Sequence, residues 1–168
     1  MTLTGKAHIP KKQKDDINTD YIISGRYKYK TQDPNELAKQ VMEDLDPEFY
    51  GRLQKGDFLV AGKNFGCGSS REQAPQAIKY AGISAVLAKS FARIFYRNCF
   101  NLGLPAIECD TDGIEEGDEL EVDLNSGIIK NKTKGREIKI SPLPRTMQVL
   151  LADGGLVEHF KKHGGFKL

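Results

Sequence analysis

Tryptophan is absent from this 168-residue chain, and cysteine occurs only three times, as Cys67, Cys99 and Cys109. No two cysteines have the C-x-x-C spacing of a zinc site or an iron–sulfur motif. Their odd number also argues against a disulfide framework. We therefore expect the chain to bind no metal or cofactor itself, and we interpret Cys99 and Cys109 as small core residues. We assign no chemistry to Cys67.

Histidine is equally scarce, with His8, His159 and His163. His159 and His163 are four residues apart, so they could share one face of a helix near the C-terminus. Without a neighbouring carboxylate–histidine pattern, a solvated helix end is favoured there over a metal site.

Long apolar runs and an excess of one charge are also missing. No apolar run approaches the 18 residues of a membrane-spanning helix, and residues 1–14 lack the apolar core of a signal peptide. Lys plus Arg is 25 and Asp plus Glu is 23, a net charge of +2, which argues against a dedicated nucleic-acid binder. We expect a cytoplasmic protein in which residues 1–168 form a single domain.

Strand and helix patterns alternate through the middle of the chain, which predicts right-handed crossovers and a mainly parallel core sheet. The apolar patterns predict strands at 58–62, 84–89 and 104–108, and helices at 70–80 and 92–102.

The flanking regions predict smaller elements. A short edge strand is expected at 7–9, an exposed loop at 26–32 and a helix at 35–44 capped by Asp33 or Asn35. The turn signal Asn125-Ser126-Gly127 predicts a β-hairpin, with a third antiparallel strand at 136–140. A closing helix at 144–162 should break or bend at Gly154-Gly155. The expected class is thus α/β, with a mainly parallel core sheet and an added antiparallel hairpin.

The most chemically distinctive segment, residues 64–73, reads NFGCGSSREQ and connects a predicted buried strand to a predicted helix. In parallel sheets, ligands usually bind at such junctions. Gly66 and Gly68 allow close backbone approach, and Arg71 offers a planar guanidinium suited to carboxylate or phosphate. An anion site is one interpretation of this loop.

Simple helix capping is the competing interpretation. Ser69 with Glu72, and Ser70 with Gln73, each match a capping box. The spacing of a Walker phosphate loop is absent, and the order G-C-G-S-S differs from the G-x-S-x-G of a hydrolase nucleophile elbow.

Three motifs together resemble a known family. DDINTDYIISGRY, FGCGSSREQAP and SFARIFYRNCFNLGLPAIE are similar to segments of the small subunits of isopropylmalate isomerase, in the aconitase superfamily. The motifs occur in order, and the resemblance covers nearly the whole chain. It implies a swivelling β/β/α three-layer domain. It also implies a large-subunit partner whose three cysteines ligate a [4Fe–4S] cluster, and reversible dehydration of a 2-hydroxy di- or tricarboxylate.

The resemblance also implies roles for individual residues. Ser69 matches the serine whose alkoxide removes the proton beside a carboxylate, and Ser70 and Arg71 match residues that bind substrate carboxylate. Asn18-Thr19-Asp20 matches a segment near the subunit cleft, although a turn that caps local backbone is favoured there. Ser90-Phe91-Ala92-Arg93 is interpreted as strand–helix packing, with Arg93 holding a carboxylate within the fold.

The chain departs from the family pattern in the loop that should read the variable end of the substrate. This specificity loop consists of Arg26, Tyr27, Lys28, Tyr29, Lys30 and Thr31. The resemblance favours 2-isopropylmalate as the substrate, in leucine biosynthesis. An apolar loop residue would suit an isopropyl group, whereas Lys28 or Lys30 could suit an extra carboxylate, as in homoaconitate. Both lysines could also face solvent.

Three functions therefore stay open: an isopropylmalate-type small subunit, a relative acting on homoaconitate, dimethylmalate or a citrate-type substrate, and a stand-alone small-anion-binding module.

Overall fold

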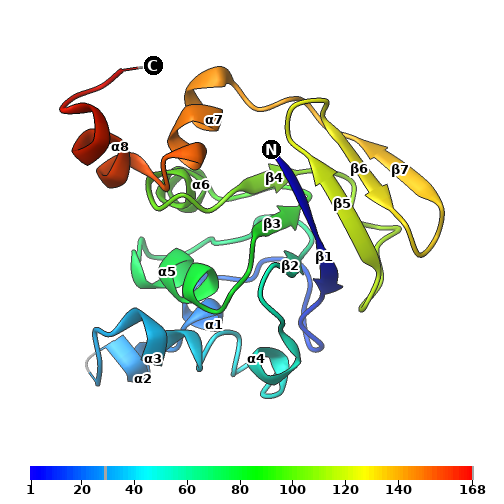
Figure 1. Ribbon diagram of the computed structural model, residues 1–168. Coiled ribbons are helices and arrows are strands. Elements are labelled where there is room, and N and C mark those ends of the chain that lie inside the picture. Colours follow the sequence, from blue (N-terminus) through cyan, green and yellow to red (C-terminus); the bar gives the residue numbers. More distant parts are fainter. Residues whose placement is uncertain (29, 168) are drawn as a thin grey trace.

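A single mixed sheet forms the centre of the molecule. Its strands are β1 (Thr2–His8), β2 (Phe58–Val60), β3 (Ala85–Ala88), β4 (Ala106–Glu108), β5 (Glu119–Asp123), β6 (Ile128–Asn131) and β7 (Arg136–Lys139). The computed structural model describes residues 1–28 and 30–167, with Lys28 described by its backbone alone. The seven strands lie in the order β4-β3-β2-β1-β5-β6-β7 (Figure 1). Strands β1 to β4 run parallel, and β5, β6 and β7 continue the sheet in antiparallel fashion.

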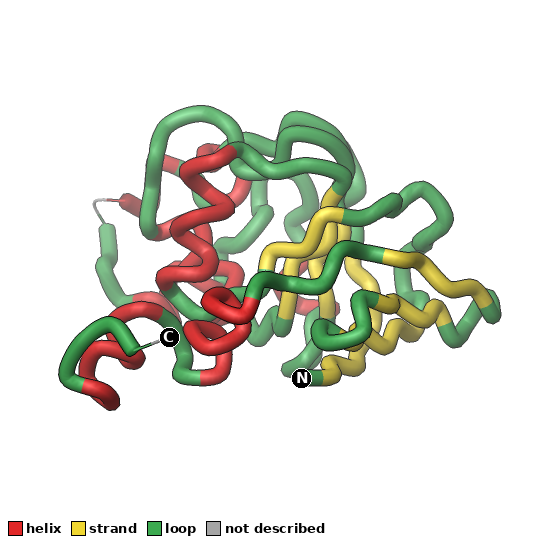
Figure 2. Tube along the Cα trace, turned by 90° about the horizontal axis from the view of Figure 1, so that it is seen from above, coloured by secondary structure: helices red, strands yellow, loops and turns green. Residues whose placement is uncertain are grey.

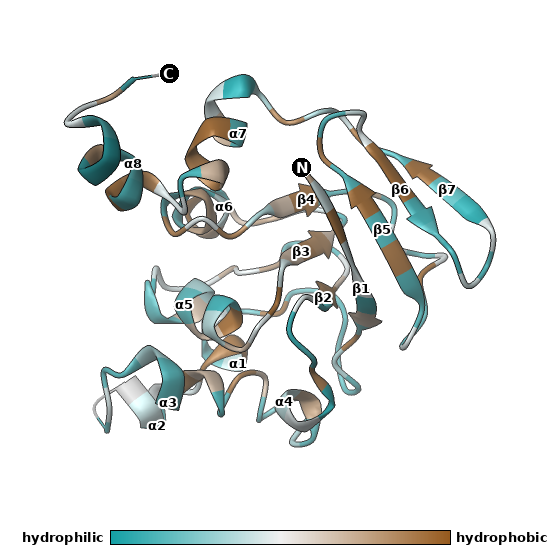
Figure 3. Ribbon diagram, viewed as in Figure 1, coloured by the Kyte–Doolittle hydropathy of each residue, from teal (hydrophilic) through white to brown (hydrophobic). Residues whose placement is uncertain are grey.

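Burial along the strands distinguishes the two halves of the sheet. β2 and β3 are buried at every position, as expected of parallel strands covered on both faces. In β5, more buried and more accessible residues alternate, which is the pattern of a strand with one face on the core. Figure 3 shows the same division, with β3 largely apolar and the outer strand β7 largely polar.

The prediction of a short edge strand at residues 7–9 was wrong. β1 is seven residues long and lies in the middle of the sheet, pairing with β2 through Ala7 and His8 and with β5 along Thr2 to Lys6. The residues at its start are mostly polar or small, so they lack the apolar alternation that marks a strand in sequence. Backbone hydrogen bonding to β5 supplies the order that the side chains do not indicate.

The helices lie mainly at one side of the molecule, and the antiparallel strands β5 to β7 of the sheet lie at the other (Figures 1 and 2). They are α1 (Thr19–Ile22), α2 (Gly25–Lys28), α3 (Pro34–Ala38), α4 (Phe49–Arg52), α5 (Gln73–Tyr80), α6 (Arg93–Asn101), α7 (Arg145–Ala152) and α8 (Leu156–His163). Over the part of the chain described, none of them has the length and apolarity needed to cross a membrane.

Several predicted helix boundaries require correction. The helix expected at 35–44 ends at Ala38 in α3, because the chain then turns and Met42 adopts a positive φ of 59°. Asp33 is its cap, accepting a hydrogen bond from the backbone N–H of Asn35. The loop expected at 26–32 begins as one helical turn, α2.

The predictions for the hairpin and for the closing helix were confirmed. β5 and β6 form the hairpin around Asn125-Ser126-Gly127, and β7 adds the third antiparallel strand. The closing helix is broken into α7 and α8 at Gly154 and Gly155, both with positive φ. The α/β class with a parallel core and an added antiparallel hairpin is therefore confirmed.

Candidate functional site

Three segments that are distant in sequence meet beyond the carboxyl ends of β2 and β3. The glycine-rich loop after β2 lies between the segment preceding α1 and the segment that follows β3. On one side, the Gly66 N–H donates to the Ile17 carbonyl at 2.8 Å, and the Thr19 N–H donates to the Cys67 carbonyl at 2.9 Å. On the other side, the Phe65 N–H donates to the Ser90 carbonyl at 3.0 Å. Loops after neighbouring parallel strands thus converge, as they do in other open α/β sheets.

Gly66 makes this close packing possible. Its φ is +81°, a conformation that favours glycine, and a Cβ at this position would overlap the ring of Phe95. Phe95 is buried and packs edge-to-face on Phe65, with ring centroids 5.2 Å apart. The first turn of α6 therefore supports the loop from below and fixes the path of its backbone.

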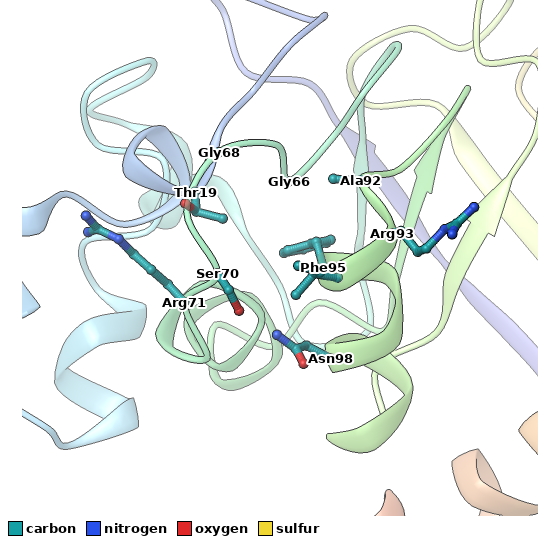
Figure 4. Close-up of a pocket in the computed structure, with 10 residues that line it drawn as sticks. Thr19, Gly66, Gly68, Ser70, Arg71, Ala92, Arg93, Phe95 and Asn98 are labelled. Carbon is teal, nitrogen blue, oxygen red and sulfur yellow. The ribbon is translucent and has the colours of Figure 1, made fainter.

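These segments enclose a cavity of about 210 Å³ (Figure 4). It is lined by residues of all three: Thr19, Gly66, Gly68, Ser70, Arg71, Ala92, Arg93, Ile94, Phe95 and Asn98. In the close-up, the hydroxyl of Ser70 and the side-chain amide of Asn98 point toward one another from opposite walls.

The two serines lie ahead of the neighbouring helix and do not cap it. The helix predicted to start at Ser70 starts at Gln73, and its N-cap Glu72 makes no side-chain capping hydrogen bond. The capping-box interpretation was therefore wrong. Both serines are exposed; Ser70 lines the cavity, whereas Ser69 lies outside its lining.

Arg71 is held by a neighbour at the edge of the cavity. Its Nη2 lies 2.6 Å from Oδ1 of Asp20, and its buried Nη1 has no hydrogen-bond partner among the described residues. A Cβ added at Gly25 would lie 3.5 Å from that Nη1, so the start of α2 packs against the guanidinium. In Figure 4 the guanidinium extends away from Asn98. One donor of Arg71 is therefore without a partner in the described part of the chain and is buried against the start of α2.

The segment Asn18-Thr19-Asp20 caps local backbone and also contributes to the cavity. Asn18 caps α1 by accepting a hydrogen bond from the Tyr21 N–H at 2.9 Å, as the turn interpretation predicted. Thr19 lines the cavity and donates its hydroxyl to the Ser69 carbonyl at 2.7 Å. Local capping therefore positions Thr19 and Asp20. These two residues hold Ser69-Ser70-Arg71, here called the serine–arginine segment.

The predicted specificity loop lies beside this site, and none of its described side chains lines the cavity. Arg26 Nη2 lies 2.9 Å from an oxygen of Asp44, and the Tyr27 hydroxyl donates to Glu43 at 2.6 Å. Lys30 is exposed, with Nζ 5.6 Å from the centre of the Tyr27 ring. Thr31 accepts a hydrogen bond from the Asp33 N–H. Tyr29 and the side chain of Lys28 lie outside the described residues.

Sequence reasoning missed the contribution of α6 to the cavity. Asn98 was not singled out, and the segment around Arg93 was interpreted as strand–helix packing with Arg93 holding a carboxylate. Phe91 and Phe95 do pack against the loop, but Arg93 is exposed and forms no ion pair with any carboxylate in the described part of the chain. The available signal was topological: this segment follows β3, the parallel neighbour of β2, so it had to emerge at the same edge of the sheet.

The three cysteines share one property, which is a raised thiol pKa. Cys99 is fully buried, which raises the pKa of its thiol. Burial, followed by the charge of Asp110, raises the pKa of Cys109 to about 12. Burial and Asp16 also raise the pKa of the Cys67 thiol. Neutral thiols are poor metal ligands and weak nucleophiles.

The prediction of a solvated helix end at His159 was wrong, because His159 is fully buried. Its Nδ1 donates to Asp153 Oδ2 at 2.8 Å, and its Nε2 accepts the Lys167 N–H at 3.2 Å. Asp153 also pairs with His163 and Lys162. Asp153, His159 and His163 have the residue types of a metal site. However, both ring nitrogens of His159 are already engaged, so this cluster is better suited to fastening α8 to the end of α7.

Comparison with known proteins gives consistent results at three levels. The aconitase C-terminal domain family matches residues 6–112. The 3-isopropylmalate dehydratase small subunit of Caldicellulosiruptor bescii is 62% identical over 163 residues, which is 96% of either chain. Small subunit 2 from Archaeoglobus fulgidus is 56% identical over the whole of both chains. The crystal structure of 3-isopropylmalate dehydratase from Methanocaldococcus jannaschii has a TM-score of 0.91 and 49% identity, covering 98% of this chain and 96% of that one.

Proposed function

Because the chain belongs to the 3-isopropylmalate dehydratase small subunits of the aconitase family, we propose that it works as one subunit of a two-subunit hydro-lyase. In this proposal the substrate is 2-isopropylmalate, the product is 3-isopropylmalate and the pathway is leucine biosynthesis. The observation that carries the proposal is identity of 62% to such a small subunit across nearly the entire length. Residues 1–168 would act as one swivelling unit.

The reaction requires a proton and a hydroxyl group to leave adjacent carbons and then return in exchanged positions. We assign the proton step to Ser69. Its alkoxide would take the proton from the carbon beside a carboxylate, the C–OH bond of the adjacent carbon would break, and a C=C bond would form. The proton and the hydroxyl group would then add to the opposite carbons.

Ser69 is suited to this role because its side chain is exposed and its backbone is held in place. The side chain is open to a partner or substrate, while its backbone carbonyl is held by Thr19 at 2.7 Å. A serine is a weak base unless the surroundings stabilise its anion. The guanidinium of Arg71, two residues along the same loop, would supply positive charge.

Ser70 and Arg71 are assigned to the substrate carboxylate. The Ser70 hydroxyl points into the cavity, and Arg71 also lines it and has one donor without a partner among the described residues. A carboxylate is the acceptor that a hydroxyl and a guanidinium bind together most favourably.

The large subunit is expected to carry the [4Fe–4S] cluster, with three cysteines as its ligands. Iron there would supply a Lewis acid for the oxygen of the substrate. Cys99 and Cys109 do not fit that role, because Cys99 is buried, Cys109 is partly buried, and burial raises the pKa of both thiols.

The segment Arg26–Thr31 is proposed to read the variable end of the substrate. Support for this comes from its position, because Gly25, the residue just before it, packs against the guanidinium of Arg71. Homoaconitate or a dimethylmalate-type compound is the alternative substrate, favoured if Lys28 or Lys30 turns toward the cleft.

The direct test is to mix the purified chain with a cluster-bearing large subunit of a relative and to follow conversion of 2-isopropylmalate. Activity should appear only in the mixture and should saturate as the small subunit is added. The same mixture with Ser69→Ala serves as the control for contaminating enzyme. No activity on any hydroxy-carboxylate, together with tight binding of a small anion by the isolated chain, would instead support a stand-alone binding module.

A further inference from the structure

We infer that Asn98 is a substrate-binding residue that donates a hydrogen bond to the same carboxylate as Ser70. This inference rests on the proposed function and adds one contact to it. Asn98 lies in the second turn of α6, across the cavity from the serine–arginine segment. In Figure 4, its side-chain amide points toward the hydroxyl of Ser70.

The polar atoms of this side chain are uncommitted. Asn98 is partly buried, and its amide makes no hydrogen bond to any residue in the described ranges 1–28 and 30–167. Its backbone carbonyl accepts the Leu102 N–H at 3.1 Å, a contact that any residue at this position would provide. The side chain therefore has donor and acceptor capacity available toward the cavity that it lines.

The rest of the α6 wall cannot supply this chemistry. Ala92, Ile94 and Phe95 present apolar surface, and Arg93 points away from the cavity in Figure 4. Asn98 is thus the polar group that α6 aims at the space beside Ser70. A hydroxyl and an amide N–H on opposite walls converge on one acceptor, and a carboxylate oxygen fits that position.

A purely structural role accounts poorly for asparagine here. Asparagine is a weak helix former, and α6 ends only three residues later at Asn101. Alanine at position 98 would lose no hydrogen bond within the described chain and should favour the helix slightly. Stability and substrate binding are therefore expected to respond in opposite directions to Asn98→Ala.

The experiment uses the complex with the large subunit and compares Asn98→Ala, Asn98→Asp and wild type. A hydrogen bond to a charged group contributes enough that its loss should raise KM about tenfold or more. We expect kcat within about threefold of wild type, because a contact kept throughout the reaction affects binding and not the chemical step. Melting temperatures should be equal or slightly higher for Asn98→Ala.

Asn98→Asp places an acceptor where a donor is needed, so its KM should exceed that of Asn98→Ala and should fall as the pH is lowered. Asn125→Asp, an exposed asparagine in the hairpin turn, is the matched control for the added charge and should keep the wild-type KM. Titration of each variant with the large subunit should give the wild-type midpoint.

A KM within twofold of wild type for both Asn98 variants would overturn the inference, as would a weaker subunit titration that accounts for the whole change. A lower melting temperature with unchanged KM would show a structural role. These outcomes all require an active wild-type complex. If the wild-type complex itself acts on no hydroxy-carboxylate, the proposed function fails, and the role of Asn98 fails with it.

Discussion

Two polar regions of the molecule differ in how completely their side chains satisfy one another. The first, here called the His8 network, joins His8 and Asp57 to Glu116, Arg52 and Asp46. His8 Nε2 lies 2.7 Å from Asp57, and Nδ1 lies 2.9 Å from Glu116. Arg52 bridges Glu116 to Asp46, to which it donates two hydrogen bonds at 3.0 and 2.8 Å.

Backbone groups complete the network. Asp57 accepts the N–H groups of Lys6 and Gln54, and Glu116 accepts that of Ile9. Asp46 is only 1% exposed and Asp57 only 5%, so these groups have exchanged water for one another. Each charge has a partner, which is the condition for burying charge in a fold.

The cavity region has the opposite character. Ser69 and Ser70 are exposed, Asn98 makes no side-chain hydrogen bond within the described residues, and Nη1 of Arg71 is buried without a partner. An unsatisfied buried donor costs stability, which agrees with the binding role that we propose for Arg71. The comparison teaches that the polar groups that satisfy one another hold the fold, whereas the unsatisfied ones gather where we propose that the substrate binds.

The largest expected effect separates these regions directly. Ser69→Ala should lower kcat of the complex by about 10²- to 10⁴-fold, because a positioned proton-transfer group is lost. Its melting temperature should stay close to wild type, since the hydroxyl caps no helix. Steady-state kinetics and a melting curve provide the two measurements. Retention of the rate with a lower melting temperature would place Ser69 with the structural groups.

The second effect lies in the His8 network and should show the reverse pattern. Asp46→Asn removes a charge that Arg52 neutralises, and it should reduce the free energy of unfolding by about 2–4 kcal/mol. This is less than for a fully enclosed pair, because Arg52 keeps 24% side-chain exposure. Denaturant unfolding gives the value, with Lys39→Ala, from an exposed ion pair, as a control expected to change by less than about 1 kcal/mol. The kcat of Asp46→Asn should remain near wild type.

The third effect is a loss of stability in acid. Burial opposes ionisation of Asp46, but the hydrogen bond and charge of Arg52 hold its pKa below the usual value. In Asp57, burial is likewise outweighed by the N–H groups of Lys6 and Gln54 and by His8, so its pKa is also lowered. Both carboxylates therefore stabilise the fold fully above the unfolded-state pKa of about 3.9, and that stabilisation is lost as the pH falls below it.

Unfolding free energies measured from about pH 6 to pH 2.5 test this expectation. The wild-type curve should fall, and the difference between wild type and Asp46→Asn should shrink toward the acid end. A difference that stays constant across the range would show that the ionisation of Asp46 contributes nothing.

The smallest effect concerns the proposed specificity loop. Lys28→Leu with Lys30→Asn should shift kcat/KM toward 2-isopropylmalate and away from homoaconitate, by an amount on the order of 1–3 kcal/mol. Competition between the two substrates gives the ratio. If the ratio stays within twofold while Ser69→Ala abolishes both activities, the loop does not read the substrate.

Much of the fold could be predicted because its strands carry clear apolar patterns. β2, β3 and β4 alternate with helices, and the Asn-Ser-Gly turn marks the hairpin. β1 was underestimated because most of its pairing is made by backbone groups, for which the side chains give no signal. α3 was overestimated because apolar spacing continues past Ala38, while the chain itself turns inward to bury Val41 and Met42.

The sequence indicated most of the residues of the candidate site, but it gave less information about how they are arranged. The serine–arginine loop was found from its glycines and its position after a strand. Whether its serines cap the helix depended on a three-residue difference in where α5 begins, which local propensity cannot resolve. Asn98 was missed because only tertiary structure brings the second turn of α6 opposite Ser70.

The central position of β1 also has a consequence for how the protein is made. Thr2 pairs with Asp123, and Ala7 pairs with Phe58, so β1 is synthesised before both of its partner strands. During translation it can join β2 early, but its other edge stays open until the hairpin has left the ribosome. Until then, the nascent chain exposes an unpaired strand edge, the kind of surface that chaperones protect and that aggregation exploits.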